Sequence, residues 1–105
     1  MKSKELMLIK NFPRIFQRMS ASTHDLEVCV TFYTCQHKEY DRLYEFCNVL
    51  QAYLDYMNTS SQTKIPQVVI EEVRCLDNHI KIVYTGGDHY VRSLVKEYLT
   101  QRTGK

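Results

Sequence analysis

The chain of 105 residues has no tryptophan, only three glycines and two prolines, and no run of eighteen apolar residues. So little glycine and proline excludes collagen-like and low-complexity chains, and the missing apolar run predicts that there is no transmembrane helix. Hydrophobic residues make up 44% of the chain and charged residues 25%. This mixture is too apolar for intrinsic disorder, and the length predicts a single small domain.

The sequence also lacks the motifs that common catalytic and cofactor-binding sites use. It contains no P-loop, dinucleotide fingerprint, nucleophile elbow or zinc-protease motif. Glu71 and Glu72 alternate along a predicted strand, so they point to opposite faces and do not form an acid–base pair. Cys35 and His37 could form a thiol catalytic pair, but no orienting acid accompanies them. We therefore expect no enzymatic activity, no cofactor, no metal site and no small-molecule substrate.

Four cysteines could form two disulfides, a metal site or plain core: Cys29, Cys35, Cys47 and Cys75. No Cys-x-x-Cys pair occurs, and the spacings fit no zinc knuckle. The apolar stretch at residues 6–9 is too short for a signal peptide, and no small-residue cleavage site follows it. Without a secretory route, reduced thiols are expected. The interpretation we favour is four buried, unreactive cysteines.

The hydrophobic pattern predicts three strands and two helices. Residues 26–34 alternate between apolar and other side chains, which indicates a strand with one buried face formed by Leu26, Val28, Val30 and Phe32. Apolar residues recur at three- and four-residue steps over residues 39–57, as in an amphipathic helix of about five turns. Residues 68–74 and 79–85 are strand-like, and residues 75–78 form a short hairpin connection between them.

A final helix is predicted after Gly86 and Gly87, which end the last strand. Asp88 is well placed to cap this helix by accepting hydrogen bonds from free backbone amides. Gly104 marks its expected end. The apolar stripe of the helix consists of Tyr90, Val91, Leu94, Val95, Tyr98 and Leu99.

These elements predict an α+β fold in the order β-α-β-β-α, with both helices on one face of a small mixed sheet. The other face of the sheet would be open or covered by a partner. Residues 1–22 read as a basic N-terminal arm, in which Pro13 interrupts the chain and one or two helical turns could run from Arg14 to Ser20. Residues 23–105 form the predicted domain.

The net charge of +2 conceals a strong asymmetry. Residues 1–20 carry five basic side chains and one acidic, residues 21–78 carry four basic and nine acidic, and residues 79–105 carry five basic and two acidic. Basic ends suggest a face for a polyanion, although a solvated surface without a partner is the plain alternative. The candidate RNA-binding residues are His89, Arg92, Lys96, Arg102 and Lys105 near the C-terminus, and Lys2, Lys4, Lys10, Arg14 and Arg18 in the arm.

The final helix resembles that of a known family. The sequence HYVRSLVKEYLT at residues 89–100 is similar to RYLKYLTKKYLK in the eukaryotic large-subunit ribosomal protein twenty-two family (the e-type). Five positions match identically: Tyr90, Leu94, Lys96, Tyr98 and Leu99. The two preceding strands, and the first strand with its helix, follow the pattern of the family, so the resemblance covers roughly residues 26–102.

The resemblance implies an RNA-binding protein on the outer surface of the large ribosomal subunit, in the cytoplasm, with ribosomal RNA and neighbouring ribosomal proteins as partners. Arg92 and Lys96 would be the matched cations, and His89 stands where the family has arginine. Asp88, Glu97, Thr100 and Gln101 replace lysines usual in the family. The family also continues into two more strands, so the chain would be a shortened, divergent member.

RNA would then be recognised through phosphate contacts, with tyrosines such as Tyr84 available for stacking. A different class of function also fits the pattern. A small protein-interaction module could use the acidic first helix of the domain and the open sheet face to bind another chain.

Overall fold

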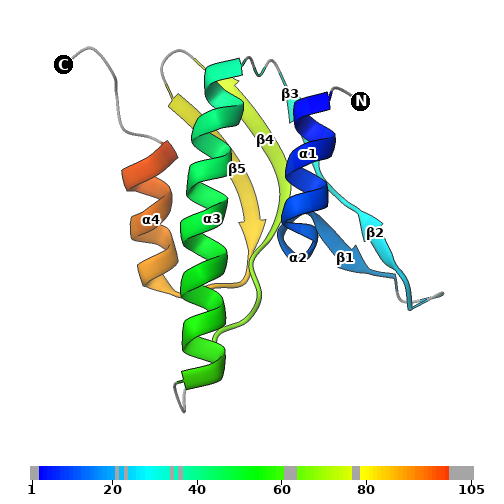
Figure 1. Ribbon diagram of the computed structural model, residues 1–105, viewed down its shortest axis with the longest axis vertical. Helices are drawn as coiled ribbons and strands as arrows, with labels where there is room; N and C mark the ends of the chain where they lie inside the picture. The colour runs from blue at the N-terminus through cyan, green and yellow to red at the C-terminus, as the bar shows by residue number, and fades with distance from the viewer. Residues whose placement is uncertain are drawn as a thin grey trace.

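The computed structural model describes residues 3–20, 22, 24–33, 35, 37–60, 64–76 and 79–99. Its elements in chain order are α1 (Ser3–Asn11), α2 (Pro13–Phe16), β1 (Gln17–Met19), β2 (Leu26–Val28), β3 (Thr31–Tyr33), α3 (His37–Ser60), β4 (Val69–Leu76), β5 (His79–Thr85) and α4 (His89–Leu99) (Figure 1).

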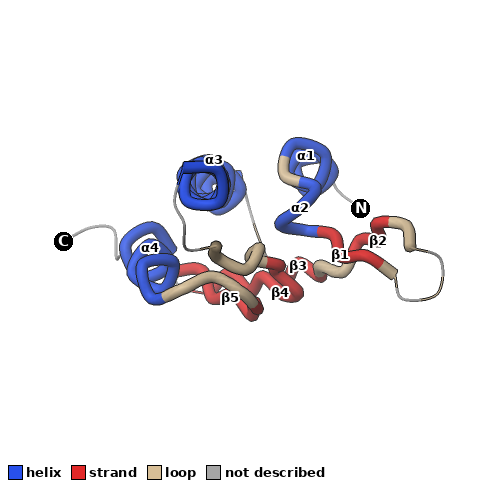
Figure 2. The backbone as a smooth tube through the Cα atoms, turned by 90° about the horizontal axis from the view of Figure 1, so that it is seen from below, coloured by secondary structure: helices blue, strands red, loops and turns tan. Residues whose placement is uncertain are grey.

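The main sheet is mixed and has three strands in the order β3-β4-β5. Strand β3 runs parallel to β4, with α3 as the crossover between them, and β5 runs antiparallel to β4. Strands β1 and β2 form a separate antiparallel pair. Helices α1, α3 and α4 all lie on one side of the strands (Figure 2). The predicted α+β class, with the two helices of the domain on one face of a mixed sheet, is confirmed.

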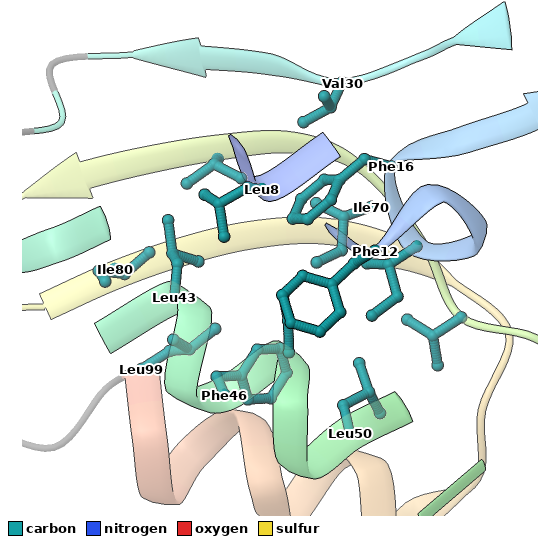
Figure 3. Close-up of a cluster of buried hydrophobic side chains, with 14 of the residues drawn as sticks. Leu8, Phe12, Phe16, Val30, Leu43, Phe46, Leu50, Ile70, Ile80 and Leu99 are labelled. Atoms are coloured by element: carbon teal, nitrogen blue, oxygen red, sulfur yellow. The ribbon is translucent and has the colours of Figure 1, made fainter. Parts of the chain in front are cut away.

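The core lies between α3 and the sheet. Leu43, Phe46 and Leu50 of α3 are fully buried and lie in one cluster with Ile70 of β4 and Ile80 of β5 (Figure 3). Burying each such side chain contributes about 1.5–3 kcal/mol relative to leaving it in water. The three-and-four spacing of apolar residues therefore predicted a long helix here correctly, although α3 extends two to three residues beyond the predicted range 39–57 at each end.

The N-terminal segment, predicted as a basic arm over residues 1–22, packs into this core. Leu8, Ile15 and Phe16 are fully buried, and the Phe16 ring lies 5.9 Å from that of Phe32. The helical turns predicted from Arg14 to Ser20 are confirmed only as far as Phe16, where α2 ends and the chain continues as β1. The segment packs against the sheet because this removes its large apolar side chains from water.

The predicted strand over residues 26–34 is divided into β2 and β3, which belong to different sheets. Leu26 and Val28 are about half exposed, whereas Val30 is buried between the two strands. The expected buried face is therefore wrong for β2, because this part of the chain pairs with β1 and extends away from the helices (Figure 1).

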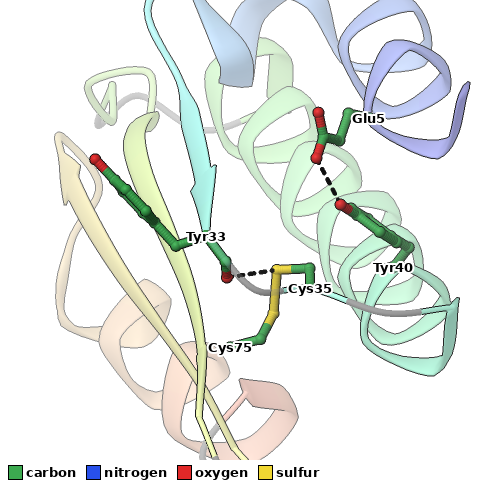
Figure 4. Close-up of a disulfide and its surroundings, with 5 residues drawn as sticks. All are labelled: Glu5, Tyr33, Cys35, Tyr40 and Cys75. Atoms are coloured by element: carbon green, nitrogen blue, oxygen red, sulfur yellow. Dashed lines mark hydrogen bonds between the residues drawn. A yellow bond between two sulfur atoms is a disulfide. The ribbon is translucent and has the colours of Figure 1, made fainter. Parts of the chain in front are cut away.

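Two of the four cysteines form a disulfide, which corrects the expectation of reduced thiols throughout. Cys35 follows β3 and Cys75 lies near the end of β4, and their Cα atoms are 5.1 Å apart (Figure 4). Neighbouring parallel strands bring these residues together across forty positions of sequence. Cys47 is buried and Cys29 half-buried, and burial raises the pKa of both thiols.

Candidate nucleic-acid interface

A tight glycine turn fixes the start of α4. Gly86 and Gly87 have φ angles of 84° and 80°, in the left-handed region that side chains disfavour. A Cβ atom at Gly86 would lie 2.1 Å from the backbone oxygen of Gln67, and the Gly87 amide donates a 2.9 Å hydrogen bond to the Pro66 carbonyl. The two glycines therefore act as the predicted strand-to-helix turn.

Asp88 caps α4, as the sequence predicted. Its Oδ1 accepts a 3.1 Å hydrogen bond from the Val91 amide, and its Oδ2 accepts a 2.7 Å hydrogen bond from the hydroxyl of Tyr53 on α3. Desolvation opposes ionisation, but the hydrogen bonds from Tyr53 and Val91 hold the pKa of Asp88 below its ordinary value. Desolvation and the same hydrogen bond raise the pKa of Tyr53 to about 12.

Packing fixes which side of α4 faces outward. Val91, Leu94 and Leu99 are buried, and the rings of Tyr90 and Tyr53 lie 4.5 Å apart against α3. Because 3.6 residues make one turn, this leaves the opposite side of the helix in solvent.

The exposed side of α4 carries three of the predicted RNA-binding residues. His89, Arg92 and Lys96 are exposed and follow one another at three- and four-residue steps, so they form one row about 10 Å long. No carboxylate among the described residues lies within 4.0 Å of the Arg92 guanidinium. The row can therefore supply cations to phosphate groups without first breaking an ion pair at Arg92. Glu97, also exposed, reduces its net charge.

Three predicted cations of the N-terminal segment form ion pairs with other parts of the protein surface instead. Lys4 Nζ lies 3.3 Å from Asp41 Oδ1, Arg14 Nη1 lies 3.8 Å from Asp55 Oδ1, and Arg18 Nη1 lies 2.9 Å from Glu71 Oε2. These ion pairs link α1, α2 and β1 to α3 and β4 at the surface.

The structure does not bring these N-terminal cations together with the row on α4. Helices α1 and α4 lie on opposite flanks of α3, so the two sets face different sides (Figure 2). Lys10 is exposed, and the described residues place no carboxylate within 4.0 Å of it. Lys2, Arg102, Lys105 and the predicted helix end at Gly104 fall outside the described residues.

Two cations on the open sheet face, Arg74 and Lys81, were not among the predicted RNA-binding residues. Arg74 of β4 pairs with Tyr33 of β3 on one side and with Lys81 of β5 on the other, so the three side chains form a row across the sheet. Tyr84, which we had considered for base stacking, packs against the core on the other side. The register of β3 on β4 was the missing information, because a crossover connection hides it from the local pattern.

Other chemistry is sparse in the part of the chain that the structure describes. These residues contain no group of three histidine, cysteine, aspartate or glutamate side chains arranged to hold a metal ion. No described helix is both long enough and apolar enough to cross a membrane. Met7, Tyr40 and Tyr44 are among the residues that line a groove between α1 and α3. Beside this groove, the Tyr40 hydroxyl donates a 2.6 Å hydrogen bond to Glu5 (Figure 4). Comparisons of the chain with protein-family models, with curated proteins and with solved structures found no match.

Proposed function

We propose that the protein is an RNA-binding constituent of the large ribosomal subunit and that the exposed side of α4 contacts ribosomal RNA. The observation that carries this proposal is the row of His89, Arg92 and Lys96, which lies outward on a helix held in place by the Asp88 cap and the glycine turn. The same helix carries the resemblance to the ribosomal family, and Arg92 and Lys96 are its matched cations.

A fixed row of cations binds RNA mainly through phosphate oxygens. Arg92 presents a planar guanidinium that can bind a phosphate through two parallel N–H groups, whereas the ammonium of Lys96 acts as a point charge. Such contacts release counterions, so affinity falls with salt and depends little on base sequence. Recognition of a particular RNA helix would then come from its shape.

The N-terminal ion pairs bear on which residues contact RNA and on the alternative function as a protein-interaction module. Lys4, Arg14 and Arg18 pair with carboxylates of other elements and lie apart from the row on α4, so we assign the contacts that hold the protein on the large subunit to α4. The alternative of a protein-interaction module relied partly on acidic residues of the long helix. Asp41 and Asp55 of α3 are the partners in two of these ion pairs, which weakens that alternative.

Sedimentation with large ribosomal subunits tests the proposal. The wild-type protein should co-sediment with large subunits at low salt and be released as salt rises. The double variant Arg92→Glu with Lys96→Glu should lose this association, while its circular dichroism and thermal unfolding stay close to those of the wild type. Wild-type protein that never sediments with large subunits would contradict the proposal.

A matched pair of single variants provides the control. Arg92→Glu and Lys10→Glu both reverse an exposed cation that has no carboxylate within 4.0 Å among the described residues. They change the net charge equally, but only the first lies on α4. Equal loss of association in both variants would show that total charge, rather than the α4 row, determines binding.

A further inference from the structure

We infer that the uncovered face of the β3-β4-β5 sheet is a second RNA-binding surface, which takes the phosphodiester backbone and bases of a single-stranded segment. This inference rests on the proposed RNA-binding function and adds a site that lies on a different face from α4. Its centre is the cross-strand row formed by Tyr33, Arg74 and Lys81.

None of the described helices covers this side of the sheet (Figure 2). The side chains that face the helices include Val73 and Ile80, which are fully buried. Their neighbours along each strand alternate to the other face, where Tyr33 is 38% exposed and Arg74 and Lys81 are exposed. The row therefore lies in solvent on the open face of the sheet.

Two contacts hold the Arg74 guanidinium in an orientation in which it could bind an anion. Its Cζ lies 4.2 Å from the centroid of the Tyr33 ring, and its Nε donates a 2.8 Å hydrogen bond to Glu72 Oε2. These two contacts fix the plane of the guanidinium, and the described residues leave both terminal nitrogens, Nη1 and Nη2, without a partner. A fixed guanidinium with two open N–H groups matches the oxygens of a phosphate.

Lys81 adds a second cation directly opposite Arg74 on the neighbouring strand. The described residues place no carboxylate within 4.0 Å of its ammonium group. Glu72 therefore offsets one charge of the row and leaves a positive excess. Adjacent strands lie about 4.8 Å apart, so the row of three side chains is about 10 Å long.

Aromatic and apolar groups beside these cations favour RNA bases over a simple anion. Leu76 and Val83 are each 45% exposed and lie on opposite sides of the row, because Leu76 follows Arg74 on β4 and Val83 follows Lys81 on the antiparallel β5. The face of a sheet cannot enter the deep, narrow groove of an RNA duplex, whereas unpaired bases stack on exposed aromatic and guanidinium planes. The occupant that fits is thus a single strand.

Fluorescence anisotropy with a labelled twenty-nucleotide oligouridine tests this inference on the full chain. The double variant Arg74→Gln with Lys81→Gln should bind at least about tenfold more weakly, and its salt slope should fall by about 1.4, since each phosphate contact of a single strand contributes about 0.7. Tyr33→Leu should weaken binding by about 5- to 100-fold through lost stacking. Circular dichroism verifies that each variant is folded.

A second set of variants separates this inference from the proposed function. Arg92→Glu with Lys96→Glu should abolish association with large subunits and reduce oligouridine binding far less than the sheet-face variants do. If oligouridine binding depends on α4 and not on the sheet face, the inference is wrong and the proposed function stands. If the sheet-face variants keep full oligouridine affinity but lose a ribosomal protein in pull-down experiments, the face binds protein and the inference is again overturned.

Discussion

The hydroxyl of Tyr53 on α3 donates a 2.7 Å hydrogen bond to the carboxylate of Asp88, which caps α4. This bond ties the start of the proposed RNA-binding helix to the longest helix of the protein. Tyr53→Phe removes the bond and keeps the ring against Tyr90. We expect the free energy of unfolding to fall by about 1 kcal/mol, the usual net contribution of such a bond. Urea denaturation measures the change, and an unchanged midpoint would show that the bond contributes nothing.

The same pair predicts how stability depends on pH. The pKa of Asp88 is lowered in the folded protein, so its contribution is present at neutral pH and is lost as the pH falls below its ordinary value of 3.8. The pKa of Tyr53 is raised from 10.0 to about 12, so its contribution is present below pH 10 and lost as the pH rises toward 12.

The stability curves of two variants test whether Asp88 causes the loss of stability in acid and Tyr53 the loss in alkali. The Asp88→Asn protein should lose less stability than the wild type on acidification below about pH 4. Tyr53→Phe should likewise remove part of the alkaline loss. Parallel stability curves for wild type and variants at both extremes would contradict the assignment.

The glycine turn before α4 should tolerate no side chain at its first position. In Gly86→Ala the new Cβ would lie 2.1 Å from the Gln67 carbonyl oxygen, a backbone atom that cannot move aside cheaply. The left-handed φ alone costs about 1–3 kcal/mol for a residue with a side chain. Gly87→Ala is the matched control, because its nearest contacts are side-chain atoms at 3.0–3.1 Å. Thermal unfolding should show a larger loss for Gly86→Ala, and equal losses would refute the steric argument.

Cys35 and Cys75 should be protected from thiol reagents in the unreduced, denatured protein. Mass spectrometry after alkylation should then find two modified cysteines, Cys29 and Cys47, and four after reduction. Chain-entropy arguments give about 4 kcal/mol of stabilisation for a loop of this length. Cys35→Ser with Cys75→Ser should lower the free energy of unfolding by up to this amount. Four modified cysteines without reductant would show that the disulfide is absent.

The N-terminal segment should behave as core. Phe16→Ala should cost about 3–5 kcal/mol, as large-to-small changes in cores do. Leu6→Ala on α1 is the control, because Leu6 is 54% exposed and its truncation should change stability by less than about 0.5 kcal/mol. If Phe16→Ala unfolds at the same denaturant concentration as the wild type, the segment is a dispensable arm after all.

Local periodicity predicted α3, β4, β5 and α4 because each has a long pattern of one period. The N-terminal segment carries a pattern too: Leu8, Phe12 and Ile15 recur at helical spacing, with Ile9 and Phe16 beside them. Pro13 and the surrounding charges concealed it, although proline is well tolerated at the first position of a helix, where α2 places it.

Contacts between distant parts of the sequence could not be predicted in this way. Lys4 and Asp41 are 37 positions apart, and Arg18 and Glu71 are 53 apart, so no local pattern shows that these cations are already engaged. The Cys35–Cys75 disulfide and the row of Tyr33 beside Arg74 depend on the parallel pairing of β3 with β4. That register follows from how α3 packs on the sheet, which is a property of the whole fold.

The salt dependence of binding to purified large-subunit ribosomal RNA tests the central claim most directly. Affinity should fall linearly with salt on logarithmic axes, and Arg92→Glu with Lys96→Glu should lower the slope by about 2, since each phosphate contact to a duplex contributes about 0.9. The Lys10→Glu protein should keep the wild-type slope. An unchanged slope and affinity in the folded α4 double variant would contradict the proposed RNA-binding role of this helix.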